Sequence, residues 1–506
     1  MESLLVKITS LYEMYKTSPN TISKLDYYIN TQLPSLLHKY NEQEKKRLFL
    51  EKESDKYINN FLTDPNQQFF YIAATDIFIK YDGENYQFIN EDDLWITILN
   101  DITEKSVLIE WKQKIKSILI KRIKEQSLFN TIPESATVQY VINFFTPTLF
   151  DTKEDVKHFM ALIGDNILNK KTNLYYFLPK ESKLFFDTLE SICQYNFKNK
   201  LGITSTLRYR YRGEEYNKSR LLYFTKSIQN KSCWLSFLKD NLFNFLVVCC
   251  YYSTRYINAD KYVNKQNQNF KNKIFYLKNN TKQEFISKFK DTMLVEESGG
   301  QIHIKDMFFL WKIYLKQKNL PNMIYKAEFE NILKDTINSS TSFFINIKSN
   351  YLNNTKMVQK FWHQFITREI DEELEISELH ALITKWSNDE NINCVGFNEN
   401  NLSAIIEHFY DDITIENGKF LIGIKCNLWD KQGDMLEAFQ HKFNKEINKD
   451  ITIYESYVMF CKYINNQGKL LTVSKKYYYK YIDKVIPEQY IKDGRILLVY
   501  WTNFSV

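Results

Sequence analysis

Three segments in the C-terminal part of the chain share one pattern of apolar and polar positions. Each begins with isoleucine and carries an acid two residues later, leucine or methionine after six, a large apolar residue after seven and an aromatic residue after ten. The segments are IKDMFFLWKIY from Ile304, ISELHALITKW from Ile376 and IYESYVMFCKY from Ile453. This spacing places the apolar residues on one face of a helix, and the helix dipole favours an acid in the first turn. We therefore expect a helix at each of the three places.

A second helical pattern follows each segment at a nearly constant distance. The second patterns begin at Tyr325, Phe397 and Val473, which lie 21, 21 and 20 residues after the leading isoleucines. Asn398 and Ser474 are suitable N-caps for these helices, whereas Lys326 is not. Extended sequence comes next, at residues 341–349, 413–429 and 491–501.

The order of helix, turn, helix and strands is the outline of a winged-helix module. In the second copy, Asn417 and Gly418 supply the positive φ angles of a hairpin turn. The adjacent glycines Gly299 and Gly300 mark the entrance to the first copy. Either three modules repeat in register, or unrelated amphipathic helix pairs share this spacing. We expect the repeat, and two modules within residues 371–506 in which Ile376 and Ile453 occupy equivalent places.

The N-terminal half begins with helical sequence over residues 2–62. The alternating segment FFYIAATDIFIKYDGENYQFI from Phe69 predicts a small β unit, and Asp82 and Gly83 provide its turn. Asn90 is the expected N-cap of the helix that comes next. A small sheet between helices therefore opens the chain.

The chain resembles primase-helicases of poxviruses, other large DNA viruses and satellite phages over residues 69 to about 350. FFYIAATDIFIKYDGENYQFINEDDLWITIL resembles the small domain before their ATPase, and IHIKDMFFLWKIYLKQKNLPNMIYKAEFENIL resembles the winged-helix domain after it. Between them, residues 153–197, KEDVKHFMALIGDNILNKKTNLYYFLPKESKLFFDTLESICQYNF, resemble the first part of a superfamily 3 helicase core. The resemblance implies a helix, a strand, a phosphate loop and a second helix in this order.

The residues that would bind a nucleotide depart from that family pattern. A phosphate loop needs glycines, and a lysine followed by serine or threonine. Here Leu178 to Phe185 read LPKESKLF, without glycine, and Leu184 follows Lys183. The segment KSRLLYFTKS resembles the strand that bears the metal-binding acid, but it ends in Tyr223, Phe224 and Thr225. We expect a degenerate member that is not an enzyme, hydrolyses no ATP and holds no cofactor.

Composition and charge exclude several other classes. Seven cysteines without a CxxC pair and seven scattered histidines argue against a zinc site. The longest strongly apolar run, LFNFLVVCCYY from Leu242, is too short to span a membrane, and no signal peptide is expected. We expect an intracellular protein, in the host cytoplasm or a viral factory, with no membrane partner and no small-molecule substrate. The net charge of +6 is modest, so nucleic-acid binding requires local basic patches.

Two segments are candidates for such patches. In LRYRYRGEEY, a strand would place Arg208, Arg210 and Arg212 on one face and Tyr209 and Tyr211 on the other. The arginines would then meet phosphates while the tyrosines stack on bases, or the tyrosines would pack while the arginines pair with neighbouring acids. In SKKYYYKYIDK, the candidate residues at the start of the third module's second helix are Lys475, Lys476 and Lys480. The equivalent helix of the middle module is acidic and suits packing or protein contact.

The basic helix VLIEWKQKIKSILIKRIKEQ from Val107 is interpreted as a solvated face. The sequence as a whole predicts a helix-rich, multidomain α+β protein. The expected regions are 1–149, helical with a small hairpin; 150–296, ATPase-like; and the winged-helix-like modules 297–370, 371–448 and 449–506. We expect a non-enzymatic nucleic-acid-binding or scaffold protein of a large DNA virus, with viral protein partners. The alternative is a protein-interaction scaffold in a viral replication, transcription or translation (mRNA-binding) assembly.

Overall fold

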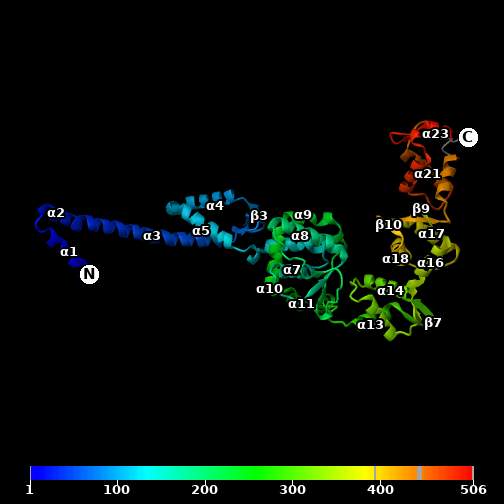
Figure 1. Ribbon diagram of the computed structural model, residues 1–506, viewed down its shortest axis with the longest axis horizontal. Helices are drawn as coiled ribbons and strands as arrows, with labels where there is room; N and C mark the ends of the chain where they lie inside the picture. The colour runs from blue at the N-terminus through cyan, green and yellow to red at the C-terminus, as the bar shows by residue number, and fades with distance from the viewer. Residues whose placement is uncertain (1, 393–394, 441–446, 504–506) are drawn as a thin grey trace. The chain divides into compact units, whose positions relative to one another are not determined.

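Helices dominate the structure (Figure 1), and each sheet among the described residues has two or three strands. The computed structural model describes residues 2–392, 395–440 and 447–503. The chain divides into two units, Met1–Thr281 and Lys282–Val506. The helix-rich, multidomain α+β class predicted from the sequence is confirmed.

The first part of the N-terminal unit is an antiparallel sheet covered by helices. Its strands are β1 (Gln68–Ile72), β2 (Ile77–Tyr81) and β3 (Tyr86–Ile89), paired in that order. The helices are α1 (Glu2–Tyr15), α2 (Pro19–Tyr27), α3 (Leu33–Leu62), α4 (Glu91–Glu104) and α5 (Lys112–Glu125). Phe69, Phe78, Ile98 and Ile115 share one core, which joins the sheet to α4 and α5.

The turn between β2 and β3 lies where the sequence predicts it. Gly83 has a φ of +93°, and the Asp82 carboxylate accepts hydrogen bonds from the backbone N–H groups of Glu84 and Asn85. Asn90 holds the N-cap position of α4, but its side chain does not accept from the helix. Instead its amide donates to the Asp93 carboxylate at 3.3 Å.

The second part of the N-terminal unit packs helices around a parallel sheet. The strands β4 (Tyr175–Phe177), β5 (Leu207–Arg208) and β6 (Ser219–Leu221) are ordered β5-β4-β6. The helices are α6 (Ser135–Thr148), α7 (Lys153–Ile167), α8 (Lys183–Phe197), α9 (Leu235–Asp240), α10 (Leu242–Tyr256), α11 (Ala259–Asn264) and α12 (Gln268–Ile274). The β4 strand leads through a short turn into α8, so this region has the strand, turn and helix order expected for residues 175–197.

The apolar run from Leu242 forms α10, which is buried against α7. Gly164 of α7 makes this approach possible, because a Cβ atom there would collide with the backbone carbonyl of Cys249. Asp165 follows and accepts hydrogen bonds from the Ser253 hydroxyl at 2.6 Å and the Ala259 N–H at 2.7 Å. Of the helices in the described ranges, none has the length and apolar character needed to cross a bilayer.

The C-terminal unit contains three successive groups of helices and strands. The first comprises α13 (Lys282–Met293), β7 (Val295–His303), α14 (Ile304–Gln317), α15 (Lys326–Thr336) and β8 (Phe343–Lys348). The second comprises α16 (Asn353–Phe365), β9 (Ile366–Glu375), α17 (Ile376–Asp389), α18 (Glu399–Phe409), β10 (Thr414–Glu416) and β11 (Phe420–Cys426). The third comprises α19 (Lys431–Ala438), β12 (Ile451–Thr452), α21 (Ile453–Asn466), α22 (Lys475–Val485), β13 (Ile491–Lys492), β14 (Arg495–Ile496) and α23 (Leu498–Asn503).

Ile304, Ile376 and Ile453 are each the first residue of a helix, at equivalent places in the three groups. In every group, the strand before this helix pairs antiparallel with a strand that follows the second helix: β7 with β8, β9 with β11, and β12 with β14. Asn398 and Ser474 cap the second helices with their side chains, as predicted. The shared sequence pattern therefore marks the start of the first helix of the pair in each of the three groups.

The starts of the groups differ from the boundaries read from the sequence. The expected boundary at residue 297 falls inside β7, and the one at residue 371 falls inside β9. The strand before each leading isoleucine has no shared pattern, so the repeat gives no sign of it. Gly299 and Gly300 lie within β7, at an irregularity in its pairing with β8. A Cβ at Gly300 would lie 2.6 Å from the Ile347 carbonyl oxygen, so Gly300 allows the two strands to approach, whereas Gly299 has a φ of +78° that favours glycine.

His158 of α7 is fully buried, and neither of its ring nitrogens has a hydrogen-bond partner. Burial lowers the pKa of His158 to about 4, although Asp260 and Asp155 favour its charged form. Lys273 and Arg220 also disfavour the imidazolium. The folded protein thus holds a neutral imidazole at a pH where the unfolded chain binds a proton.

Stability should consequently fall as the pH drops from 6.5 towards about 4, because protonation of His158 then favours the unfolded chain. The loss of stability caused by His158 is absent above pH 6.5 and reaches about 3 kcal/mol below about pH 4. Urea unfolding of the protein and of His158→Phe across this range measures it. We expect a shallower pH dependence for the variant, and two parallel curves would contradict this account.

Candidate nucleic-acid interface

The arginine-tyrosine segment does not form the predicted strand. β5 contains only Leu207 and Arg208, and the chain beyond it turns. The Arg208 guanidinium donates to the carbonyl oxygens of Ser205 and Leu207, at 3.0 and 2.7 Å, and lies 3.6 Å from the Glu214 carboxylate. The alternation of faces over residues 208–212 is therefore wrong, because the local carbonyls and Glu214 draw Arg208 back onto the chain.

The remaining residues of this segment separate into packed and exposed side chains. Tyr209 packs against the core of the N-terminal unit, and burial raises the pKa of its phenol. The Tyr211 ring lies 6.4 Å from the Tyr216 ring. Arg210 and Arg212 are exposed. The packing alternative therefore describes Tyr209 and Arg208, whereas phosphate binding by Arg210 and Arg212 stays a prediction.

The lysines of α22 point at acids of the middle group. Lys476 forms ion pairs with Glu416 of β10 and, at 3.5 Å, with Glu373 of β9. The Lys480 ammonium donates to the Asp371 carbonyl oxygen at 2.8 Å. The Lys475 ammonium instead lies 4.8 Å from the centroid of the Tyr454 ring. Phosphate binding at Lys476 and Lys480 would require both to leave these contacts.

Buried charges also connect β9 and α17 of the second group to the third group. We call this set of contacts the joint. The Lys431 ammonium lies 2.6 Å from the Glu378 carboxylate and donates to the Glu373 carbonyl oxygen at 2.9 Å. Burial raises the pKa of Glu378, and Lys431 opposes that shift. Glu372 accepts from the Tyr477 hydroxyl at 2.8 Å and from the Gln432 amide at 2.7 Å. The second and third groups are consequently held together by buried polar contacts, although Glu373 Oε1 and Glu378 Oε1 are buried without a hydrogen-bond partner.

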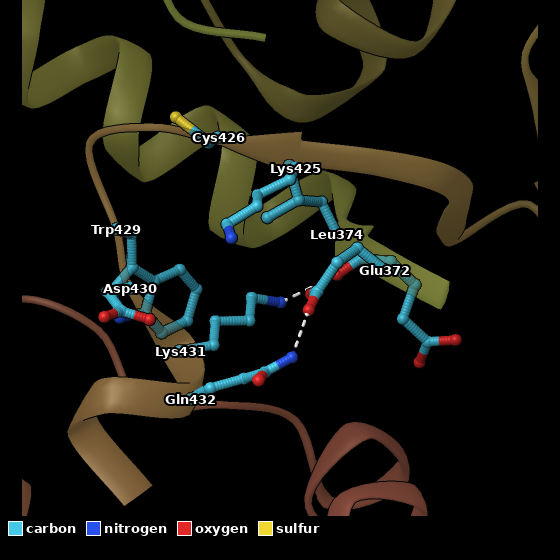
Figure 2. A pocket seen from close by; sticks show the side chains of 9 residues that line it. Glu372, Leu374, Lys425, Cys426, Trp429, Asp430, Lys431 and Gln432 are labelled. Atoms are coloured by element: carbon cyan, nitrogen blue, oxygen red, sulfur yellow. Dashed lines mark hydrogen bonds between the residues drawn. The ribbon is translucent and has the colours of Figure 1, made fainter. Parts of the chain in front are cut away.

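Figure 2 shows these contacts from close by, with Lys431 and Gln432 of α19 directed towards Glu372 of β9. The Lys431 ammonium donates to the backbone carbonyl oxygen of the next residue, Glu373. The cavity among these side chains measures about 10 Å³, which is room for about one water molecule. An organic substrate does not fit there. The charged cluster is thus a structural joint, and we assign it no catalytic role.

A different basic surface lies on α5. This 14-residue helix carries six cations and one acid: Lys112, Lys114, Lys116, Lys121, Arg122, Lys124 and Glu125. Its apolar side buries Ile115, Leu119 and Ile123 in the core. Lys114, Lys121 and Lys124 are seven and three residues apart, so they share a face away from this core. The helix therefore presents a row of positive charge.

Aromatic rings lie beside several of the α5 cations. The Lys114 ammonium is 3.8 Å from the Trp111 ring centroid, and the Lys116 ammonium is 4.4 Å from that of Trp95. Among the described residues, no carboxylate forms an ion pair with an α5 cation. We call this set, Lys114, Lys116, Lys121, Lys124, Trp95 and Trp111, the α5 surface. Positive charge without internal counter-charge, next to aromatic rings, suits a nucleic-acid backbone and its bases.

The residues at the phosphate-loop position form a tight turn. The Ser182 hydroxyl is buried and donates to the Pro179 carbonyl oxygen at 2.7 Å. Lys183 is exposed as the first residue of α8, and Phe185, two residues later, is fully buried. Within this turn the backbone N–H groups of Ser182 and Lys183 donate to the carbonyl oxygens of Pro179 and Lys180.

The strand beside it also ends without a carboxylate. Beyond β6, Phe224 packs on Phe150 at 4.9 Å, and the Thr225 hydroxyl donates to the Thr148 carbonyl oxygen at 2.7 Å. Arg220 within β6 is buried and pairs with Asp260 at 2.7 Å. A search of the described part of the chain finds no cluster of three side chains suited to holding a metal ion.

The basic character of α5 is evident in the sequence, but its interpretation as a solvated face placed it outside the predicted site. A run of lysines on a helix is usually a solvated face, and sequence gives no measure of which lysines have internal acids. The balance of charge within each helix could have indicated the α5 site. α5 has six cations and one acid, whereas the α22 lysines can pair with the acidic segment Glu369–Glu375.

Comparison with known proteins adds no assignment. A scan against protein-family models finds no matching family, and a search of curated proteins finds no similar sequence. Function must therefore be argued from the residues of this chain.

Removing one partner of the buried pair should strongly destabilise the C-terminal unit. Lys431→Met leaves Glu378 buried without its cation, so we expect a loss of about 3 to 5 kcal/mol in the free energy of unfolding. The double variant Lys431→Met with Glu378→Met should regain part of this loss, because no charge is then left unpaired. Urea unfolding monitored by tryptophan fluorescence provides the measurement.

Lys484→Met is the matched control, since Lys484 also pairs with an acid of β9, at 2.9 Å from Asp371, but both side chains are exposed. Solvent screens such a pair, so its removal should have little effect. Equal losses for Lys431→Met and Lys484→Met would show that burial does not govern this joint.

Proposed function

We propose that this chain is a non-enzymatic nucleic-acid-binding protein of a large DNA virus, derived from a primase-helicase architecture, and that the α5 surface contacts the nucleic-acid backbone. The observation that carries this proposal is the charge of α5, where six cations have no internal carboxylate partners among the described residues. A backbone phosphate is the counter-charge that such a row lacks.

The aromatic rings support single-stranded nucleic acid as one ligand. Trp95 and Trp111 are partly exposed to solvent, with the Lys116 and Lys114 ammonium groups over their rings. Bases stack on such rings with little regard to sequence. Binding through phosphates and stacking would be strongly dependent on salt and weakly dependent on sequence.

The primase-helicase origin is supported by order and topology in the N-terminal unit. β4, the turn at Lys180–Ser182 and α8 follow one another, with parallel strands on both sides of β4. Loss of ATP hydrolysis follows from the residues at this turn, namely Pro179, Ser182 and Leu184 in place of glycines and a metal-binding hydroxyl. The three groups of the C-terminal unit are, in this proposal, winged-helix-like modules.

The second candidate is a scaffold in a viral replication, transcription or translation assembly. It is favoured by α22, whose Lys476 and Lys484 pair with carboxylates of the middle group and whose Lys480 donates to the Asp371 carbonyl oxygen, so these lysines are not presented for phosphate. In that case the C-terminal modules join protein to protein. Viral proteins are the expected partners in both candidates, within the cytoplasm or a viral factory of the host cell.

Reversing the charge of the α5 surface should weaken binding to every nucleic acid alike. For Lys114→Glu with Lys121→Glu and Lys124→Glu, we expect the slope of log K against log salt to flatten by about 2 to 3, since each lost phosphate contact removes roughly 0.7 to 0.9. Fluorescence anisotropy with single- and double-stranded DNA and RNA across salt concentrations measures this slope.

The control is Lys200→Glu with Lys231→Glu and Lys239→Glu, three exposed lysines of the same unit outside α5. It changes the net charge by the same amount and should leave the slope almost unchanged. If both variants weakened nucleic-acid binding equally, the overall charge of the protein and not the α5 surface would explain the effect. If the parent protein bound no nucleic acid near physiological salt, the scaffold function would be favoured.

ATP should be neither hydrolysed nor appreciably bound. The turn before α8 lacks the glycines and the hydroxyl that phosphate and Mg²⁺ require. Isothermal titration with Mg-ATP and a phosphate-release assay should show no signal, with Lys183→Ala identical to the parent protein. Turnover that disappears in Lys183→Ala would overturn this expectation.

A further inference from the structure

α1, α2 and the first part of α3 expose a large apolar surface. Twelve large apolar side chains between residues 4 and 40 are exposed, more than a third of the area of each being open to solvent. Six of the twelve are Leu4, Leu5, Leu11, Leu36, Leu37 and Tyr40, which are 64%, 63%, 39%, 60%, 58% and 66% exposed. We call all twelve side chains together the N-terminal apolar surface. Patches of this size on soluble proteins mark interaction sites.

These helices have no core of their own. The first buried residue of the described chain is Leu50, in the second half of α3. Figure 1 shows α1 and α2 at the outer end of α3, away from α4 and α5. Helices in proteins gain most of their stability by packing an amphipathic face, and short isolated helices are marginal in water. The N-terminal helices therefore lack the packing that normally maintains such structure.

α3 buries apolar residues in its second half and exposes them in its first half. Leu50, Ser54, Tyr57 and Ile58 form the face of α3 that packs on the sheet and α5. Leu36 and Tyr40 lie close to the same side of the helix, but Gln43, Lys46 and Arg47 separate them from this buried face. α3 has 30 residues and a length of about 45 Å, and its N-terminal half, with Leu36, Leu37 and Tyr40, extends beyond the elements that cover it.

We propose that a second copy of this chain covers the N-terminal apolar surface. Residues 2–40 contain four lysines and three acids, so the surface is almost neutral. A neutral apolar face has no attraction for a strongly charged partner such as nucleic acid or an anionic bilayer, but it matches its own copy. Helices α1 and α3 of two copies would form a four-helix arrangement related by a two-fold axis.

The available area agrees with this occupant. Burial of a leucine-sized side chain removes roughly 60 to 120 Å² from water. Because the twelve side chains of the surface are between 39% and 66% exposed, they provide roughly 400 to 800 Å², and the upper end of this range reaches the roughly 800 Å² that each partner contributes to a stable interface. The inference stands apart from the proposed function, because it concerns neither α5 nor the turn before α8.

Self-association of the full-length protein tests the proposal. Analytical ultracentrifugation should show the parent protein at twice the mass of the chain in the micromolar range. The variant Leu36→Gln with Leu37→Gln and Tyr40→Gln should dissociate at least about 100-fold more easily, because each copy loses three apolar contacts while glutamine preserves helix propensity. Hydrogen exchange in residues 2–40 should slow with protein concentration in the parent protein alone.

The control is Ile132→Gln with Tyr195→Gln and Ile370→Gln, three apolar residues that are 76%, 82% and 91% exposed outside this surface. It should associate like the parent protein, and circular dichroism and thermal unfolding should confirm that both variants fold. A parent protein that is monomeric at about 100 µM would overturn the proposal. So would equal association of the two variants, or a monomer that binds phosphatidylcholine vesicles through residues 2–40.

Discussion

A lysine that already donates to a carboxylate of its own chain cannot neutralise a phosphate without giving up that contact. This constraint of charge pairing separates the basic regions of the protein more clearly than their composition does. α22 and α5 are both lysine-rich helices, yet the Lys476 and Lys480 ammonium groups of α22 lie against β9 and β10, while those of Lys114 and Lys116 in α5 lie over tryptophan rings. Structural attachment and ligand binding are therefore assigned to different helices by what surrounds each charge.

The apolar repeat was the most reliable part of the sequence, because it reports burial directly. Each leading isoleucine begins a helix, and Leu310, Ile383 and Phe460 of the shared pattern are fully buried. The acid in the first turn does more than the dipole argument requires. Glu378 and Glu455 also accept from the backbone N–H groups of Glu375 and Thr452, which closes a capping box in α17 and α21.

The site was less predictable because it depends on contacts between distant parts of the chain. The alternation of Arg208 to Arg212 is compatible with a strand, but Glu214 and nearby carbonyl groups bend the segment away from one. Lys476 meets Glu373, which is about a hundred positions earlier, and no local pattern indicates that pairing. Conversely, the solvated-face interpretation of α5 relied on how lysines usually behave, and only the surrounding side chains distinguish this helix from an ordinary one.

β9 serves two neighbours at once, and this has a consequence for how the protein can change over evolutionary time. Its backbone pairs with β11 of the middle module, while Glu372 and Glu373 bind Gln432, Tyr477 and Lys476 of the last one. A last module transferred alone to another protein would carry buried donors without their acceptors. The two modules should therefore be duplicated, lost or exchanged together during evolution.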